Sequence, residues 1–161
     1  MVTQDKIKSI LGDLQTTANA GYALAFHLQY TTPTYLFQTY ASEWLDYYGQ
    51  NSLLMRDPTI LWGFENNGHI RWSELKAADS AGVLDKAAEF GMNYGASTAV
   101  EVEGKRSLGG FSRSDREFTD AELTDLVAAV EQLHNLLDEV ENLSPETAAE
   151  LRKMSVLVTH P

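Results

Sequence analysis

The longest apolar periodicity in the sequence, over residues 119–142, constrains the fold more than any other feature. Thr119 and Glu122 have the spacing of a capping box, which opens a helix. Apolar residues then recur at steps of three and four, at Leu123, Leu126, Val130, Leu133, Leu137 and Val140. A helix with such a stripe buries it against another element, and we expect this one to cover a sheet. Val127 and Leu136 widen the stripe and leave room for a second use as a dimer interface.

The rest of the chain alternates short strands with helices. Alternating apolar residues and flanking turn residues predict strands at 22–30, 35–39, 69–72, 97–103 and 107–112, with a hairpin between the first two and another between the last two. Helical spacing and caps predict helices at 3–18, from Ser42, at 58–66, 73–78 and 80–90, and again from 146 onward.

Composition excludes several classes of protein. A chain of 161 residues with 43% hydrophobic residues is long enough for one domain with a real core. The sequence has no apolar run near 18 residues and no leader, so we expect a cytoplasmic protein that neither spans a membrane nor is secreted. It has no cysteine, and its net charge of −11 argues against this segment binding DNA phosphates itself.

Aromatic residues gather between Tyr40 and Trp72, a stretch that contains all three tryptophans of the chain. Aromatic residues at helical spacing most often form core, and Asp57 followed by Pro58 is an ordinary helix start. The same residues also suit a small-molecule pocket, because Tyr and Trp combine an apolar ring with one polar group. The residue types alone leave both interpretations open.

A family resemblance favours the pocket. The residues that carry it, in order, are Tyr40, Trp44, Tyr48, Asp57-Pro58-Thr59, Trp72, Gly91, Tyr94-Gly95 and Leu108-Gly109-Gly110-Phe111-Ser112. This series resembles the ligand-binding domain of LuxR-type quorum-sensing regulators, which are receptors for acyl-homoserine lactones. The resemblance covers about residues 5–142.

The resemblance implies a role for each polar residue. In that family the counterpart of Tyr40 hydrogen-bonds the amide carbonyl of the ligand. The counterpart of Trp44 donates to the lactone carbonyl, and that of Asp57 accepts the amide N–H. Ser112 falls where the family has a hydroxyl beside the acyl carbonyls, and Thr59 where some members have another. These roles agree with the ligand's chemistry, which needs one acceptor and several donors.

The remaining site candidates are apolar or small. The resemblance implies that Tyr48 and Trp72 line the pocket by packing. Phe26, Trp62 and Gly110 are further candidates for its wall and its volume.

Pattern and resemblance together predict an α/β/α sandwich. We expect a PAS- or GAF-like central antiparallel sheet of about five strands, helices on both faces, and a ligand slot between the sheet and the helices that begin at Ser42 and Asp57. Residues 1–142 would form the autoinducer-binding domain. Residues 143–161 would form a linker and the truncated start of a helix-turn-helix domain.

The implied function is non-catalytic sensing of an N-acyl-homoserine lactone, with no other cofactor. Ligand binding would be coupled to homodimerisation, through the helix at 119–142, and to DNA binding by a domain absent from this chain. The competing hypothesis is a solo or dominant-negative PAS- or GAF-like interaction module with another ligand or none.

Catalytic and metal chemistry have no sequence signal. Four histidines, His27, His69, His134 and His160, are scattered without metal-binding spacing. No nucleophile elbow of the G-x-S-x-G type is present, so an enzyme that hydrolyses the lactone lacks a candidate nucleophile.

Overall fold

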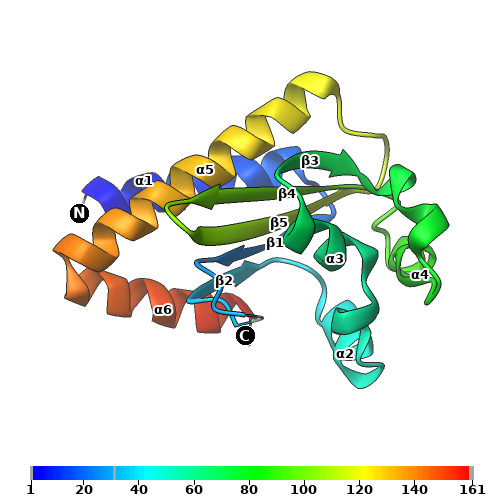
Figure 1. Ribbon diagram of the computed structural model, residues 1–161, viewed down its shortest axis with the longest axis horizontal. Helices are drawn as coiled ribbons and strands as arrows, with labels where there is room; N and C mark the ends of the chain where they lie inside the picture. The colour runs from blue at the N-terminus through cyan, green and yellow to red at the C-terminus, as the bar shows by residue number, and fades with distance from the viewer. Residues whose placement is uncertain (1, 31, 160–161) are drawn as a thin grey trace.

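The computed structural model describes residues 2–30 and 32–159, with the side chains of residues 2, 143 and 154–159 left undescribed. The described residues form six α-helices, five strands and three 3₁₀ turns (Figure 1). The helices are α1 Val2–Thr17, α2 Ser42–Gln50, α3 Pro58–Glu65, α4 Val83–Glu89, α5 Asp120–Leu143 and α6 Pro145–Thr159. The strands are β1 Gly21–Phe26, β2 Tyr35–Gln38, β3 Gly68–Arg71, β4 Tyr94–Val102 and β5 Lys105–Arg113, and the 3₁₀ turns are η1 Leu53–Arg56, η2 Trp72–Glu74 and η3 Lys76–Ala78.

The five strands form one antiparallel sheet in the order β2-β1-β5-β4-β3. Helices α1 and α5 cross one face, whereas α3 lies over the other face with α2 and α4 beside it (Figure 1). The predicted α/β architecture with helices on both faces is therefore confirmed. Both predicted hairpins are also present, because β1 pairs with β2 and β4 pairs with β5.

The turn between β4 and β5 consists of Glu103 and Gly104, so Glu103 lies outside the strand although the prediction was 97–103. Glu103 and Gly104 both have positive φ, at 52° and 81°, and Val102 pairs directly with Lys105. A two-residue hairpin turn with positive φ at both positions follows the right-handed twist of the strands. The turn therefore needs Glu103 as well as glycine in the left-handed region.

Helix α5 covers the sheet as predicted. Thr119 Oγ1 accepts from the Glu122 N–H at 3.1 Å, and the Glu122 carboxylate accepts from the Thr119 N–H at 2.8 Å, which completes the capping box. The whole apolar stripe is at most 3% exposed and packs against α1 and the sheet. Val127 and Leu136 are partly buried against the same core. The apolar stripe of α5 is thus covered within this chain, whereas Val127 and Leu136 keep part of their surface exposed.

Helix α6 packs on the same domain rather than extending away from it. Ala148 and Leu151 are buried in the core that α5 forms with β2. Arg152 pairs with Glu141 and lies over the ring of Tyr35. The predicted division at residue 143 separates two helices that share a core, and residues 160 and 161 lie outside the described part. The start of a second domain in this region stays a prediction.

Two helix predictions differ from the structure. Helix α2 begins at Ser42, but Ala41 is its N-cap and no side chain caps it, so the predicted Ser42 cap is wrong. In place of the helix predicted for 73–78, the structure has the two 3₁₀ turns η2 and η3. The helix predicted for 80–90 is present as the shorter α4. Asp79 caps α4 by accepting from the Val83 and Leu84 N–H groups, which explains why the helix begins later.

A buried histidine pair connects α5 to the sheet. His134 Nδ1 lies 2.7 Å from Ser107 Oγ, which also accepts from the His27 N–H at 3.1 Å. His27 Nε2 lies 3.1 Å from the His134 carbonyl, and the two rings are 4.5 Å apart. Burial lowers the pKa of His134 to about 4 and also lowers the pKa of His27. Both rings are therefore neutral in the folded protein at neutral pH.

We expect the free energy of unfolding to fall as the pH falls below 6.5. The unfolded chain binds protons at His134 from about pH 6.5, whereas the folded chain resists them until about pH 4. Stability is thus complete above pH 6.5 and declines by roughly 2–3 kcal/mol toward pH 4. Urea unfolding between pH 7 and 5 measures this decline. His134→Gln should flatten it, and an unchanged slope in the variant would contradict the assignment.

Candidate functional site

A cavity of about 770 Å³ lies between the sheet and the side of the domain that carries α2, α3 and α4. Its floor on the sheet consists of small residues, Ala23 and Ala25 on β1 and Gly109 and Gly110 on β5. Ala23 is paired directly with Gly110, so the middle of the sheet carries no large side chain on this face. The sheet therefore leaves space that the opposite helices do not fill.

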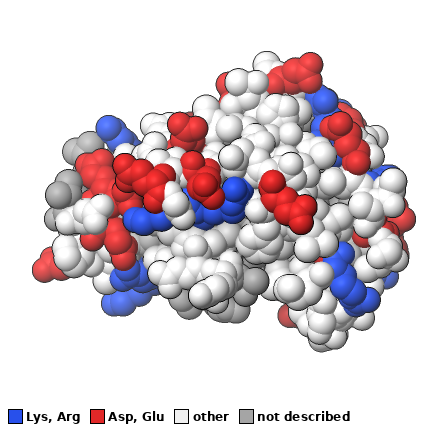
Figure 2. Space-filling view, in the orientation of Figure 1, with Lys and Arg blue, Asp and Glu red and all other residues white. Residues whose placement is uncertain are grey.

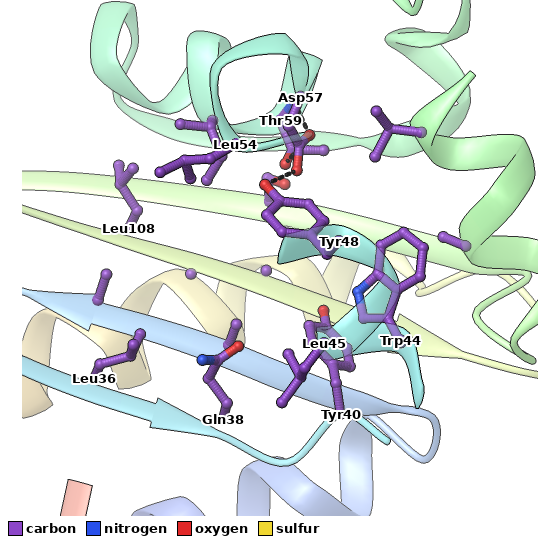
Figure 3. Close-up of a pocket in the computed structure, with 18 of the residues that line it drawn as sticks. Leu36, Gln38, Tyr40, Trp44, Leu45, Tyr48, Leu54, Asp57, Thr59 and Leu108 are labelled. Atoms are coloured by element: carbon purple, nitrogen blue, oxygen red, sulfur yellow. Dashed lines mark hydrogen bonds between the residues drawn. The ribbon is translucent and has the colours of Figure 1, made fainter. Parts of the chain in front are cut away.

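Asp57 lies at the polar end of the cavity, where it caps α3 (Figure 3). One carboxylate oxygen accepts from the Thr59 N–H at 2.9 Å and from the Thr59 hydroxyl at 2.7 Å. The other oxygen accepts from the Tyr48 hydroxyl at 2.8 Å. The predicted Asp57-Pro58 helix start is confirmed, and the same carboxylate also faces the cavity.

The electrostatics of Asp57 are those of an anion without a cation. It is 7% exposed, and no basic side chain among the described residues forms an ion pair with it. Burial raises the pKa of Asp57, although the hydrogen bonds from Thr59 and Tyr48 lower it in part. Since a carboxylate has about four lone-pair sites and three bonds are present, it has capacity for one more donor.

Two tyrosines provide hydroxyl groups beside this carboxylate. Burial, and then the charge of Asp57, raises the pKa of Tyr48 and of Tyr40, so both phenols remain protonated donors. The Ser112 hydroxyl is close enough to lower the pKa of Tyr40 in part, and the Tyr40 hydroxyl is the nearest atom to where a Cβ on Gly110 would lie, at 3.6 Å. Tyr40 therefore stands over the glycine floor, close to Asp57.

Two tryptophans form the wall next to α4. Trp44 packs against Tyr48 and Phe90, with ring centroids 5.6 and 5.4 Å away. Its indole N–H makes no hydrogen bond to a described residue, and in Figure 3 the ring nitrogen is turned toward the side where Tyr40 and Tyr48 lie. The Trp72 indole N–H, by contrast, donates to Ser97 at 3.0 Å, so Trp72 provides packing.

Seven of the ten predicted site residues line the cavity: Tyr40, Trp44, Tyr48, Asp57, Thr59, Trp72 and Gly110. Trp62 is half-buried against the neighbouring apolar cluster and is not part of the cavity wall. Ser112 is fully buried behind Tyr40, and its hydroxyl also lies 3.3 Å from the Gly21 carbonyl. This position suits a residue that holds Tyr40, so ligand contact by Ser112 stays a prediction that the geometry does not favour.

The prediction that Phe26 lines the pocket is wrong. Phe26 faces the other side of the sheet with Tyr22 and Leu24, and it is fully buried in the core beneath α5. His27 has a positive φ of 53°, which interrupts the alternation of the strand. As a result Leu28, two residues after Phe26, reaches the cavity whereas Phe26 does not.

The apolar end of the cavity also contains residues that were not predicted from the sequence. They are Pro33, Leu36, Leu54, Met55, Ile60, Phe64 and Leu108. A signal was present on β1, where the small residues Ala23 and Ala25 alternate with large ones and mark the face that stays open. Gln38, which also lines the cavity, could have been found by stepping back two positions from Tyr40 along the strand.

No metal site is seen among the residues that the structure describes. Within the described residues, no three His, Asp or Glu side chains gather in a way that could hold a metal ion, and His160 lies outside them. None of the helices in the described part combines the length and apolar composition needed to span a bilayer.

Comparison with known proteins identifies the family. A family model described as "Autoinducer binding domain" matches residues 12–140, which is most of the chain. The chain belongs to this autoinducer-binding family. The resemblance to LuxR-type regulators is thereby confirmed.

Relatives of this autoinducer-binding domain include the transcriptional activator protein SolR of Ralstonia nicotianae. The two are 29% identical over 123 residues, which is 72% of this chain and 52% of SolR. SolR of Ralstonia solanacearum is 30% identical over 102 residues, 63% of this chain and 43% of that protein. The chain thus spans about half the length of the curated relatives it matches.

Solved structures share the fold of the autoinducer-binding domain. SdiA in complex with octanoyl-rac-glycerol has a TM-score of 0.63 at 19% identity, over 85% of this chain and 60% of that chain. Escherichia coli SdiA in the space group P6522 has a TM-score of 0.63 at 20% identity, over 87% of this chain and 63% of that chain. CepR2 of Burkholderia cenocepacia, an N-acylhomoserine lactone dependent LuxR-family transcription factor, has a TM-score of 0.56 at 17% identity. The match covers 82% of this chain and 93% of that chain. A binding-domain family with transcriptional activators among its members agrees with a non-catalytic protein.

Proposed function

We propose that this domain senses an N-acyl-homoserine lactone in the cavity and does not transform it. The observation that carries the proposal is the buried Asp57 carboxylate, which forms no ion pair with a residue that the structure describes and has room for one more donor. The amide N–H of an acyl-homoserine lactone is such a donor. A buried carboxylate that gains this bond is stabilised, whereas one without a partner carries a desolvation cost.

The donors around Asp57 match the rest of that ligand. Tyr40 and Trp44 would donate to the carbonyl oxygens, and the apolar end, which includes Leu36 and Leu108, would take the acyl chain. The CepR2 comparison supports this ligand class, since that protein is described as N-acylhomoserine lactone dependent. The SdiA complex adds octanoyl-rac-glycerol as a second ligand type for comparison.

The wider part of the proposal concerns the whole regulator. We propose that ligand binding in the cytoplasm is coupled to homodimerisation and to DNA binding by a further domain. On the face drawn in Figure 2, Lys and Arg side chains are interspersed with Asp and Glu, which fits DNA contacts made elsewhere. A dimer through α5 would have to use mainly polar surface together with the partly exposed Val127 and Leu136, because the apolar stripe is covered by this chain.

Thermal unfolding with added ligands tests the proposal. At a lactone concentration 100 times Kd, binding should add about 2.7 kcal/mol to the free energy of unfolding. For a chain of this size that corresponds to a rise in Tm of roughly 5–10 °C. The panel should include acyl-homoserine lactones of several chain lengths, with octanoyl-glycerol for comparison. A flat response to every lactone would reject the proposed function, and a response to octanoyl-glycerol alone would change the ligand class.

A further inference from the structure

Three side chains point into the cavity from strand β2 and from the two residues that follow it, 39 and 40. Leu36, Gln38 and Tyr40 alternate along the chain and share this face (Figure 3). Tyr40 belongs to the polar end beside Asp57, whereas Leu36 belongs to the apolar end. Gln38 therefore stands at the boundary between the two ends of the cavity.

The amide of Gln38 faces open space. It is half-buried, and it makes no side-chain hydrogen bond to a residue that the structure describes. Gln38 is paired with Ala23 on β1, which is paired in turn with Gly110 on β5. The two floor residues beside Gln38 thus have no polar side chain that could bond to its amide. A polar group of a molecule in the cavity could do so.

Other polar groups of the cavity are already engaged or lie at the other end. The Ser97 hydroxyl accepts from Trp72, and the Thr59 hydroxyl donates to Asp57. Residues that share one face of a strand are about 7 Å apart per pair, so Gln38 lies one such step from Tyr40 toward the apolar end. A ligand whose amide group lies beside Tyr40 and Asp57 would pass Gln38 with the first part of its acyl chain.

We propose that Gln38 determines ligand specificity by selecting an acyl chain that carries an oxygen substituent, either a ketone or a hydroxyl. This inference rests on the proposed function of the same cavity. The Gln38 amide offers two donors and one acceptor, so it can bond to either kind of oxygen. A plain alkyl chain would remove the amide from water without giving it a partner, which disfavours such ligands.

Titration calorimetry with three ligands of equal length tests the inference: octanoyl-, 3-oxo-octanoyl- and 3-hydroxyoctanoyl-homoserine lactone. The unmodified chain should bind at least one oxygenated ligand about tenfold more tightly than the octanoyl ligand. Gln38→Met keeps the length of the side chain and removes its hydrogen bonds. This variant should lose the preference, with weaker binding of the oxygenated ligand and tighter binding of the octanoyl ligand.

Gln50→Met is the matched control, because Gln50 is exposed at the end of α2 and does not line the cavity. It should keep the preference of the unmodified chain, and Gln38→Leu replaces Gln38→Met if the latter does not fold. Equal affinities for the three ligands in the unmodified chain, or an unchanged preference in the Gln38 variants, would overturn the inference and leave the proposed function intact. A folded chain that binds none of the three, and no lactone of the thermal panel, would overturn both.

Discussion

Replacing Gly95 with alanine should destabilise the domain by about 3 kcal/mol or more. A Cβ at Gly95 would lie 2.0 Å from Cδ2 and 2.1 Å from Cε3 of the Trp72 ring, far inside van der Waals contact. Trp72 cannot move aside freely, because it is 9% exposed and its indole N–H is bonded to Ser97. Chemical unfolding of the variant measures the loss, and the displaced ring should also distort the wall of the cavity.

Gly12→Ala is the control for this experiment. Gly12 lies within α1, and no atom is within 4 Å of where its Cβ would be. Alanine has the higher helix propensity, so this variant should gain up to about 1 kcal/mol. If Gly95→Ala were as stable as Gly12→Ala, the close packing of Trp72 on Gly95 would not hold in solution.

Replacing Asp57 with asparagine should weaken binding of an acyl-homoserine lactone by roughly 1–3 kcal/mol, which is about 5- to 150-fold in Kd. Asparagine keeps the size of the side chain and can still cap α3, since both residues are favoured at an N-cap. It removes the anionic acceptor that the ligand N–H would use. Titration calorimetry of the variant against the best ligand of the thermal panel measures the effect.

Asp79→Asn separates ligand contact from helix capping. Asp79 also accepts from two backbone N–H groups, those of Val83 and Leu84, at 2.9 and 2.8 Å, but it does not line the cavity. This variant should lose far less ligand affinity than Asp57→Asn, because Asp79 acts on Asp57 only through its charge, which raises the pKa of Asp57. If Asp57→Asn also left affinity unchanged while lowering stability, Asp57 would be a helix cap and no more.

The fold was predictable where one local pattern decides an element. Helix α5 followed from steps of three and four between apolar residues, and these residues are the ones buried against the sheet. The boundaries of short elements were less predictable. Serine is a favoured N-cap residue, but Ser42 is already the first residue of α2 and the N-cap is Ala41. The Ser42 hydroxyl is therefore one position too late to cap the helix.

The polar end of the site was predictable because family resemblance and chemistry agree on Asp57 and its donors. The apolar end was not, because it depends on which face of each strand stays open. The positive φ at His27 turns the Leu28 side chain away from the side of the sheet that Phe26 occupies. The residue types in this segment do not predict such a backbone conformation. Ser112 shares a strand face with Gly110, yet Tyr40 lies over it and separates it from the cavity.

Strand β2 is only four residues long, and its two faces belong to different parts of the domain. One face presents Leu36 and Gln38 to the cavity. The other carries Tyr35, whose hydroxyl donates to Glu141 and whose ring lies 5.6 Å from the Arg152 guanidinium of α6. A ligand that shifted the backbone at Leu36 or Gln38 would also shift Tyr35, which is adjacent to Leu36 in the same short strand. The same four-residue strand therefore borders the cavity on one side and holds contacts to α5 and α6 on the other, which makes it the route by which a ligand would act on α6.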